Sequence, residues 1–159
     1  MDALDDRLRD GVATIGRADL VVGIPSFRNA ATIGHVASAV ARGLREHFPD
    51  AKVALINADG GSQDGTPDQV IASAADVPVA VGRYAGPSGK GSAFHAIFQC
   101  AVALEARACA VVDSDLRSIT PLWVKRLLGP IVEAQADYVA PLYARHKYDG
   151  TITNTIAYP

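Results

Sequence analysis

Apolar positions along the chain follow two alternating periods. Val21, Val22 and Ile24 form a short continuous run that ends at Pro25, which is typical of a buried strand. From Thr32 to Phe48 the apolar residues recur at three- and four-residue steps, which is typical of an amphipathic helix. The same alternation predicts further strands at 51–56, 77–81, 109–112 and 138–140, with helices that begin near 66, 92 and 120.

Local signals mark where these helices begin and break. Thr66 and Thr120 each precede a proline, and a threonine N-cap with proline at the first helical position is a helix start. Gly129-Pro130 predicts an interruption of the last helix, because proline lacks the backbone N–H donor. Strands that alternate with helices over short connections predict a mostly parallel sheet covered by helices on both faces. The predicted fold class is therefore α/β.

Composition and charge narrow the class of protein. A length of 159 residues with 49% hydrophobic and 20% charged residues suits one soluble globular domain. The net charge of −2 provides no global positive field for nucleic acid or an anionic membrane. We find no apolar run of the roughly twenty residues that a membrane helix needs, and we expect a cytoplasmic protein. Cys100 and Cys109 fit no metal-ligand spacing and are expected to be buried free thiols.

Polar clusters follow each of the first four predicted strands. The carboxyl ends of parallel strands share one edge of a sheet, which is where open α/β folds bind ligands. The sequence therefore predicts a single ligand site at this edge. Its four segments are Pro25-Ser26-Phe27, Asp59-Gly60-Gly61-Ser62, the glycine-rich residues 86–91 and Asp113-Ser114-Asp115.

The alternate carboxylates of Asp113 and Asp115 are the sharpest of these signals. Magnesium prefers oxygen ligands and is commonly held by one or two carboxylates together with substrate phosphates. The competing interpretation is that both residues only end a strand and make turn hydrogen bonds. We favour the cation site, because the pair follows an apolar strand on the shared edge.

The glycine-rich segment precedes a helix, so its backbone N–H groups and Lys90 could meet a phosphate. A P-loop would require glycine in place of Tyr84 and serine or threonine in place of Gly91, and a flexible surface turn is the other alternative. Asp59 directly follows its strand and could accept a hydrogen bond from a base or a ribose. His146 lies in a donor-rich loop that meets either an anionic co-substrate or only solvent.

Three segments resemble the family 2 nucleotide-sugar glycosyltransferases of the GT-A fold. They are I-P-S-F-R-N-A-A-T-I at 24–33, A-D-G-G-S-Q-D-G-T at 58–66 and the D-x-D of 113–115. G-K-G at 89–91 followed by V-D-S-D-L at 112–116 is most similar to the retaining glucosyl-3-phosphoglycerate and mannosylglycerate synthases. The resemblance covers essentially the whole chain.

This resemblance implies transfer of a hexose from a UDP- or GDP-sugar to a small acceptor such as glycerate or 3-phosphoglycerate, with Mg²⁺ or Mn²⁺. It makes Asp115 the principal metal ligand, places Asp113 near the ribose or the metal, and gives the catalytic role to Asp115 and Lys90. The implied nucleotide-sugar contacts are Pro25, Ser26, Phe27, Asp59, Lys90, Gly91, Asp113 and Ser114. The implied acceptor contacts are Arg145, Tyr148, Thr151 and Thr153.

The expected organisation has three parts. Residues 1–18 form a helical or flexible N-terminal segment, 19–142 form the nucleotide-sugar-binding α/β domain, and 143–159 begin an acceptor-binding region of what we expect to be a longer protein. No nucleic-acid partner is expected, and a homodimer stays open. Two rival functions also stay open: a P-loop-like phosphotransferase that uses Lys90 and Asp113, and a nucleotide-binding module without catalysis.

Overall fold

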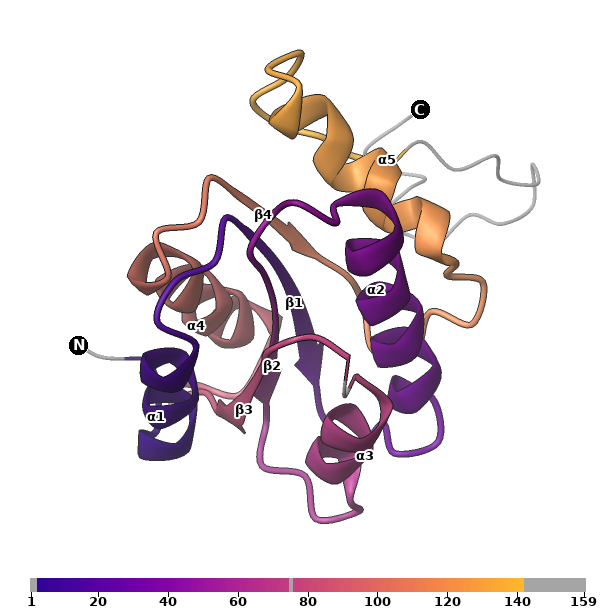
Figure 1. The fold of residues 1–159 in the computed structure, drawn as a ribbon. Coiled ribbons are helices and arrows are strands. Elements are labelled where there is room, and N and C mark those ends of the chain that lie inside the picture. Colours follow the sequence, from indigo (N-terminus) through magenta and orange to yellow (C-terminus); the bar gives the residue numbers. More distant parts are fainter. Residues whose placement is uncertain (1–2, 75, 142–159) are drawn as a thin grey trace, which may run out of the picture.

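Parallel strands form the centre of the computed structural model, which describes residues 3–74 and 76–141. The four strands of this sheet lie in the order β3-β2-β1-β4, and every neighbouring pair is parallel (Figure 1). The carboxyl ends of the strands therefore point to one edge. The strands are β1 (Leu20–Ser26), β2 (Val53–Asp59), β3 (Val79–Arg83) and β4 (Ala108–Val111).

Helices cover both faces of the sheet, as the sequence predicted. The helices α2 (Ile33–His47), α3 (Thr66–Ser73) and α5 (Pro121–Val132) pack on one face, and α1 (Asp6–Ile15) and α4 (Lys90–Ala103) pack on the other (Figure 1). No helix within the described ranges combines the length and apolar character needed to cross a bilayer. The α/β class is confirmed.

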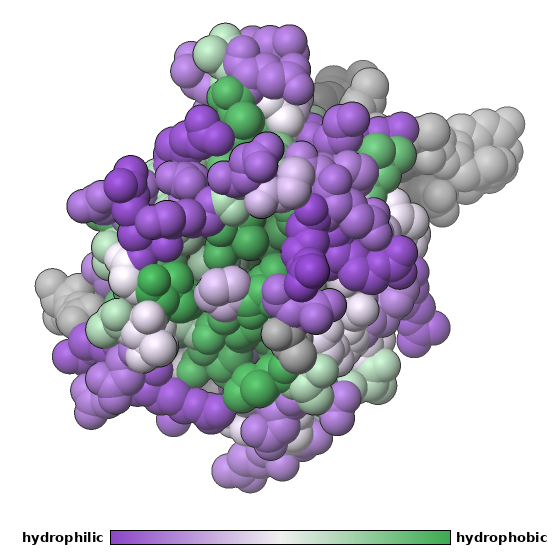
Figure 2. All heavy atoms as spheres, viewed as in Figure 1, coloured by the Kyte–Doolittle hydropathy of each residue, from purple (hydrophilic) through white to green (hydrophobic). Residues whose placement is uncertain are grey.

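The central strand β1 explains why its sequence is continuously apolar. All seven of its residues are buried, because β1 lies between β2 and β4 and has helices on both faces. Leu20, Val22 and Ile24 belong to the core under α2, α3 and α5, whereas Val21 belongs to the core under α1 and α4. Figure 2 shows hydrophobic atoms in the middle of one face, with hydrophilic residues around them.

Two helix starts differ in detail from each other. Thr120 is the N-cap of α5 and Pro121 its first residue, as predicted. The N-cap of α3 is Gly65, with a left-handed φ of 86°, and Thr66 lies one residue inside the helix. Thr66 is drawn inward because its Oγ1 donates to Asp64 Oδ1 (2.6 Å) and accepts from the backbone N–H of Asn29 (2.9 Å). The predicted N-cap at Thr66 was therefore wrong by one position.

Two further sequence predictions near the end of the described chain were wrong. Helix α5 runs through Gly129-Pro130 to Val132. Pro130 cannot donate to the carbonyl four residues earlier, but only two helical residues follow it, so the missing bond shortens the helix by little. Residues 138–140 form no strand in the described part of the chain, and Tyr138 is 82% exposed. The apolar pattern there could not reveal whether a neighbouring strand would be available for pairing, since pairing is a long-range contact.

Candidate functional site

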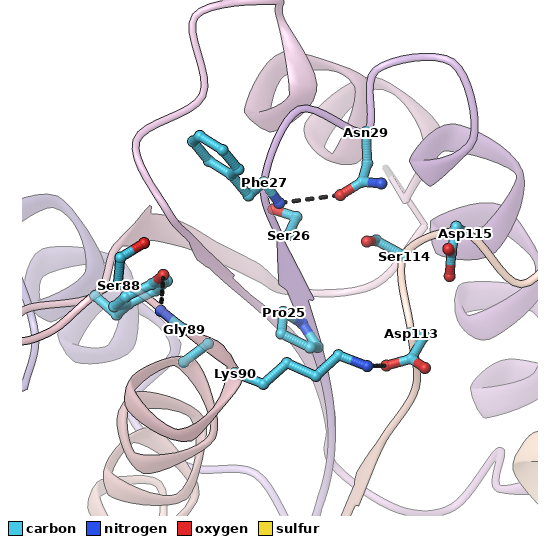
Figure 3. A pocket seen from close by; sticks show the side chains of 12 residues that line it. Pro25, Ser26, Phe27, Asn29, Ser88, Gly89, Lys90, Asp113, Ser114 and Asp115 are labelled. Atoms are coloured by element: carbon cyan, nitrogen blue, oxygen red, sulfur yellow. Dashed lines mark hydrogen bonds and ion pairs between the residues drawn. The ribbon is translucent and has the colours of Figure 1, made fainter. Parts of the chain in front are cut away.

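A cavity of about 320 Å³ lies at the carboxyl edge of the sheet. Its walls come from the end of β1 and the residues after it, from the segments after β3 and β4, and from the first turn of α4 (Figure 3). Residues more than eighty positions apart in the sequence thus share one pocket. The lining residues are Pro25, Ser26, Phe27, Asn29, Tyr84, Ser88, Gly89, Lys90, Ala93, Asp113, Ser114 and Asp115.

Most of the predicted nucleotide-sugar and metal residues meet in this cavity. The lining includes Pro25-Ser26-Phe27, Lys90 and Asp113-Ser114-Asp115. Asp59 and Gly91 are absent from the described lining. Three of the four predicted segments therefore line one cavity. The fourth, Asp59-Gly60-Gly61-Ser62, lies outside the described lining.

Asp59 supports the wall through internal hydrogen bonds. It is 3% exposed and pairs in register with Ser26, whose Oγ donates to Asp59 Oδ1 at 2.7 Å. The other carboxylate oxygen accepts from the backbone N–H groups of Gly61 (2.8 Å) and Ser62 (2.6 Å), and Ser62 Oγ also donates to Oδ1 (2.8 Å). Asp59 therefore shapes the loop after β2. Its contact with a ligand stays a prediction.

An aromatic pair lines the side of the cavity next to this loop. Phe27 is 51% exposed, and the Arg28 guanidinium lies 4.9 Å from the centre of its ring. A Cβ on Gly60 would lie 3.0 Å from Phe27 Cδ2 and 3.2 Å from Tyr84 Oη, so the absence of a side chain lets both rings approach the loop. The exposed ring of Phe27 and the partly buried ring of Tyr84 offer flat apolar surface to a base.

Sequence reasoning missed Tyr84 as a lining residue. It follows directly after β3, so its position on the shared edge was the available signal, but in the sequence it served only as evidence against a P-loop. Tyr84 Oη accepts a hydrogen bond from the backbone N–H of Gly89 at 3.2 Å. This bond ties the glycine-rich segment to the end of β3. Asn29 and Ala93 are further lining residues that were not predicted, whereas Ser88 and Gly89 belong to the predicted glycine-rich segment.

The glycine-rich segment leads straight into α4. Gly86 and Gly89 have φ values of 103° and 148°, which are unfavourable for residues with side chains. These turns bring Ser88, Gly89 and the first residue of α4, Lys90, to the pocket wall. A helix N-terminus has free N–H groups and a partial positive charge, so this wall is suited to an anion.

The two carboxylates after β4 differ in their exposure and in their contacts. Asp113 is half-buried, and its Oδ1 accepts from Lys90 Nζ at 2.7 Å (Figure 3). Asp115 is exposed and has no hydrogen-bond or ion-pair partner among the described residues. The loop between them is anchored by Thr32, whose Oγ1 donates to the backbone carbonyl of Ser114 at 2.9 Å.

The donor set fits a divalent cation that is shared with a ligand. Within residues 3–74 and 76–141, no group of three His, Cys, Asp or Glu side chains is placed to hold a metal ion. Magnesium needs only one or two carboxylates when phosphate oxygens complete its shell. Asp115 and Asp113 line the same cavity as the anion-suited wall, so they are compatible with such a site.

The predicted acceptor residues Arg145, Tyr148, Thr151 and Thr153 lie outside the residues that the structure describes. His146 lies outside them as well. Their role in binding an acceptor stays a prediction.

Comparison with known proteins decides the family. A family model described as "Glycosyl transferase family 2" matches residues 21–156. The chain belongs to glycosyl transferase family 2. The match spans all four predicted ligand segments, and the sequence-based assignment to this family is confirmed. No curated protein matches the chain.

Solved structures of related folds confirm the GT-A architecture of this family 2 chain. Glucosyl-3-phosphoglycerate synthase from Mycobacterium tuberculosis, in complex with Mn²⁺, UDP and glucosyl-3-phosphoglycerate, is 26% identical with a TM-score of 0.55. The similarity covers 78% of this chain and 43% of that one. The same synthase with Mn²⁺, UDP-glucose and phosphoglyceric acid is 28% identical, also with a TM-score of 0.55, and the similarity covers 78% of this chain and 42% of that one.

Mannosyl-3-phosphoglycerate synthase from Rubrobacter xylanophilus shares the fold at 24% identity and a TM-score of 0.54, over 79% of this chain and 39% of that one. The family 2 chain described here thus spans about two-fifths of the length of these solved structures.

Proposed function

We propose that this chain provides the nucleotide-sugar-binding part of a metal-dependent hexosyltransferase, with a UDP- or GDP-hexose as donor and a glycerate- or 3-phosphoglycerate-type acceptor. The observation that carries the proposal is the meeting of Asp113, Asp115 and Lys90 with the start of α4 in one pocket. Family membership supports sugar transfer. The glucosyl-3-phosphoglycerate synthase complexes with Mn²⁺ or Mg²⁺ and UDP support the choice of cofactor and donor.

The donor has two matching surfaces in the pocket. The rings of Phe27 and Tyr84 give the base a surface for stacking, and Asp59 holds the neighbouring loop in shape. The N–H groups at the start of α4 and the Lys90 ammonium give the diphosphate its positive wall. In this proposal the sugar, which lies beyond the diphosphate, is bound near the end of β4.

In the reaction, the bond between the anomeric carbon and the β-phosphate oxygen breaks, and its electron pair leaves with the nucleoside diphosphate. The anomeric carbon then bonds to the acceptor hydroxyl oxygen, and the hydroxyl proton is released. Asp115 and Asp113 would hold Mg²⁺ or Mn²⁺, which when bound neutralises negative charge on the leaving diphosphate. Lys90 adds a second positive charge to the same group. Arg145, Tyr148, Thr151 and Thr153 are proposed to orient the acceptor.

The test is nucleotide binding to the purified chain by isothermal titration calorimetry, with UDP, GDP and ATP, each with and without Mn²⁺. We expect binding of UDP or GDP that requires Mn²⁺ and weakens at least tenfold in Asp115→Ala. Asp50→Ala is the matched control, since Asp50 is an exposed aspartate just before β2, away from the carboxyl edge.

Preference for ATP would instead support a phosphotransferase, and unchanged binding in Asp115→Ala would refute the metal assignment. Nucleotide binding without consumption of UDP-glucose or GDP-glucose in the presence of 3-phosphoglycerate would leave a binding module as the function of this chain. A cytoplasmic location and a homodimer remain predictions from the sequence.

A further inference from the structure

Lys90 and Asp113 form an ion pair inside the proposed nucleotide pocket. The Lys90 side chain extends from the start of α4 past Pro25, and its Nζ lies 2.7 Å from Asp113 Oδ1 (Figure 3). Asp115, two residues further along, has no such partner in the described part of the chain. One of the two candidate metal carboxylates is thus already neutralised by a cation of the protein itself.

We propose that Lys90 is a built-in counter-ion that withholds Asp113 from a divalent cation until a nucleoside diphosphate draws the ammonium away. This inference rests on the proposed function and adds the order in which the two carboxylates become available to the cation. Without nucleotide, Asp115 is the carboxylate available to the cation. With nucleotide, both carboxylates become available, so the cation and the nucleotide bind cooperatively. Lys90 is then a positioning residue for metal binding as well as a contact for the diphosphate.

The charges that line the pocket support this exchange. Among the described lining residues, Lys90 is the sole lysine, arginine or histidine, its ammonium pairs with Asp113, and Asp115 lines the same pocket. A divalent cation held by both carboxylates would lie beside the ammonium, and two positive charges at such a separation repel each other. We therefore expect a cation that binds both carboxylates to compete with Lys90 for Asp113.

A diphosphate offers the displaced ammonium a second anionic partner. Lys90 begins α4, and Ser88 and Gly89 beside it form the wall that is suited to phosphate. A lysine is a compact charge on a flexible four-carbon stem, so Nζ can move between partners without movement of the helix. The side chains of Lys90 and Asp113 are 67% and 42% exposed, so water weakens their attraction and the exchange is easy.

The test is a titration of the whole chain with Mn²⁺, with and without UDP. The electron paramagnetic resonance signal of free Mn²⁺ measures how much of the ion is bound. In Lys90→Met we expect Mn²⁺ alone to bind about threefold to fivefold more tightly than in the wild type, in line with the strength of exposed ion pairs. The factor by which UDP raises Mn²⁺ affinity should shrink at least as much, because binding coupling is reciprocal.

Three further variants connect the effect to the ion pair. Lys90→Arg keeps the charge and should keep the weak Mn²⁺ binding of the wild type. Lys125→Met removes an exposed lysine on α5 outside the pocket and should change nothing. In the double variant Lys90→Met/Asp113→Asn the gain in Mn²⁺ affinity should disappear, because the freed carboxylate is gone.

The inference is overturned if Lys90→Met binds Mn²⁺ alone no more tightly than the wild type while UDP and Mn²⁺ still bind together. It is also overturned if the double variant retains the gain. Failure of the wild type to bind UDP with Mn²⁺ at all is a different result, which overturns the proposed function and this inference with it.

Discussion

At the scale of single residues, the three aspartates near the pocket differ because their surroundings differ. Asp59 is buried and its carboxylate accepts four hydrogen bonds. Asp113 has one ion pair, and Asp115 has no partner in the described ranges. A buried carboxylate that satisfies several donors stabilises the fold, whereas a partner-free exposed one is available to a ligand. Identical side chains thus have distinct expected effects on mutation.

Asp59→Ala should lower the free energy of unfolding by about 2–4 kcal/mol, because Ser26 Oγ and the N–H groups of Gly61 and Ser62 lose their acceptor. The measurement is urea denaturation followed by circular dichroism. Asp115→Ala is the control and should change stability by less than about 0.5 kcal/mol. Equal stability of the two variants would contradict the structural role of Asp59.

Cys109 should resist thiol reagents in the folded protein. Cys100 is buried as predicted, whereas Cys109 is only partly buried. Desolvation still raises the pKa of the Cys109 thiol to about 12 from the ordinary 9.0, because the apolar surroundings disfavour the thiolate. The reactive thiolate is therefore about a thousandfold scarcer at pH 8. The pKa is raised on folding, so the thiol costs no stability below about pH 9, and stability falls as the pH rises from there towards 12. Absorbance with Ellman's reagent at pH 8, before and after denaturation, measures the reactivity, and prompt labelling of the folded chain would refute this prediction.

At the scale of elements, the close packing of α2 on α5 depends on a residue without a side chain. A Cβ on Gly43 of α2 would lie 2.6 Å from the backbone carbonyl oxygen of Pro121 and 2.7 Å from Val124 Cγ2. Backbone cannot rotate away as a side chain can, so the helices would have to separate. The helical period predicted α2 well, but it could not predict this requirement, since the neighbour is nearly eighty residues away.

Gly43→Ala should therefore lower the free energy of unfolding by about 1–3 kcal/mol, although alanine is the better helix former. Gly91→Ala is the matched control, because Gly91 is also helical and a Cβ there meets nothing within 4 Å. The control should leave stability unchanged or raise it slightly. Thermal unfolding of both variants, without ligand, provides the comparison, and an unaffected Gly43→Ala would show that α2 and α5 can separate at no cost.

At the scale of the whole molecule, the strand order places the site. In the order β3-β2-β1-β4, the central β1 has β4 as one neighbour, so the loops after these two strands lie side by side (Figure 1). The long return from β3 through α4 to β4 then brings the start of α4 to the same edge. Parallel strands make the site possible, and their order decides which loops form it.

Binding of UDP with Mn²⁺ should slow amide hydrogen exchange in three separate segments, 26–29, 88–93 and 113–115. These segments line the pocket, whereas α3 does not, so peptides from Thr66–Ser73 should be unaffected. Mass spectrometry of peptides after exchange measures this pattern, and Asp115→Ala should abolish it. Protection that is confined to one segment would contradict a shared site.

By itself the sequence determined the alternation of strands and helices, the α/β class and the four polar clusters at strand ends. These properties depend on the period of apolar residues and on local turn chemistry, and both are set by residues that are close together in the sequence. It also predicted Asp113, Asp115 and Lys90 as site residues, since each follows a strand.

Only the tertiary structure decided which of these residues meet. It paired Lys90 with Asp113 across 23 positions, brought Tyr84 and Asn29 into the pocket wall and turned Asp59 inward. It also left 138–140 without a strand and carried α5 through Pro130. Each of these outcomes depends on contacts between distant segments, which local patterns do not encode because strand order and helix packing arise only when the chain folds.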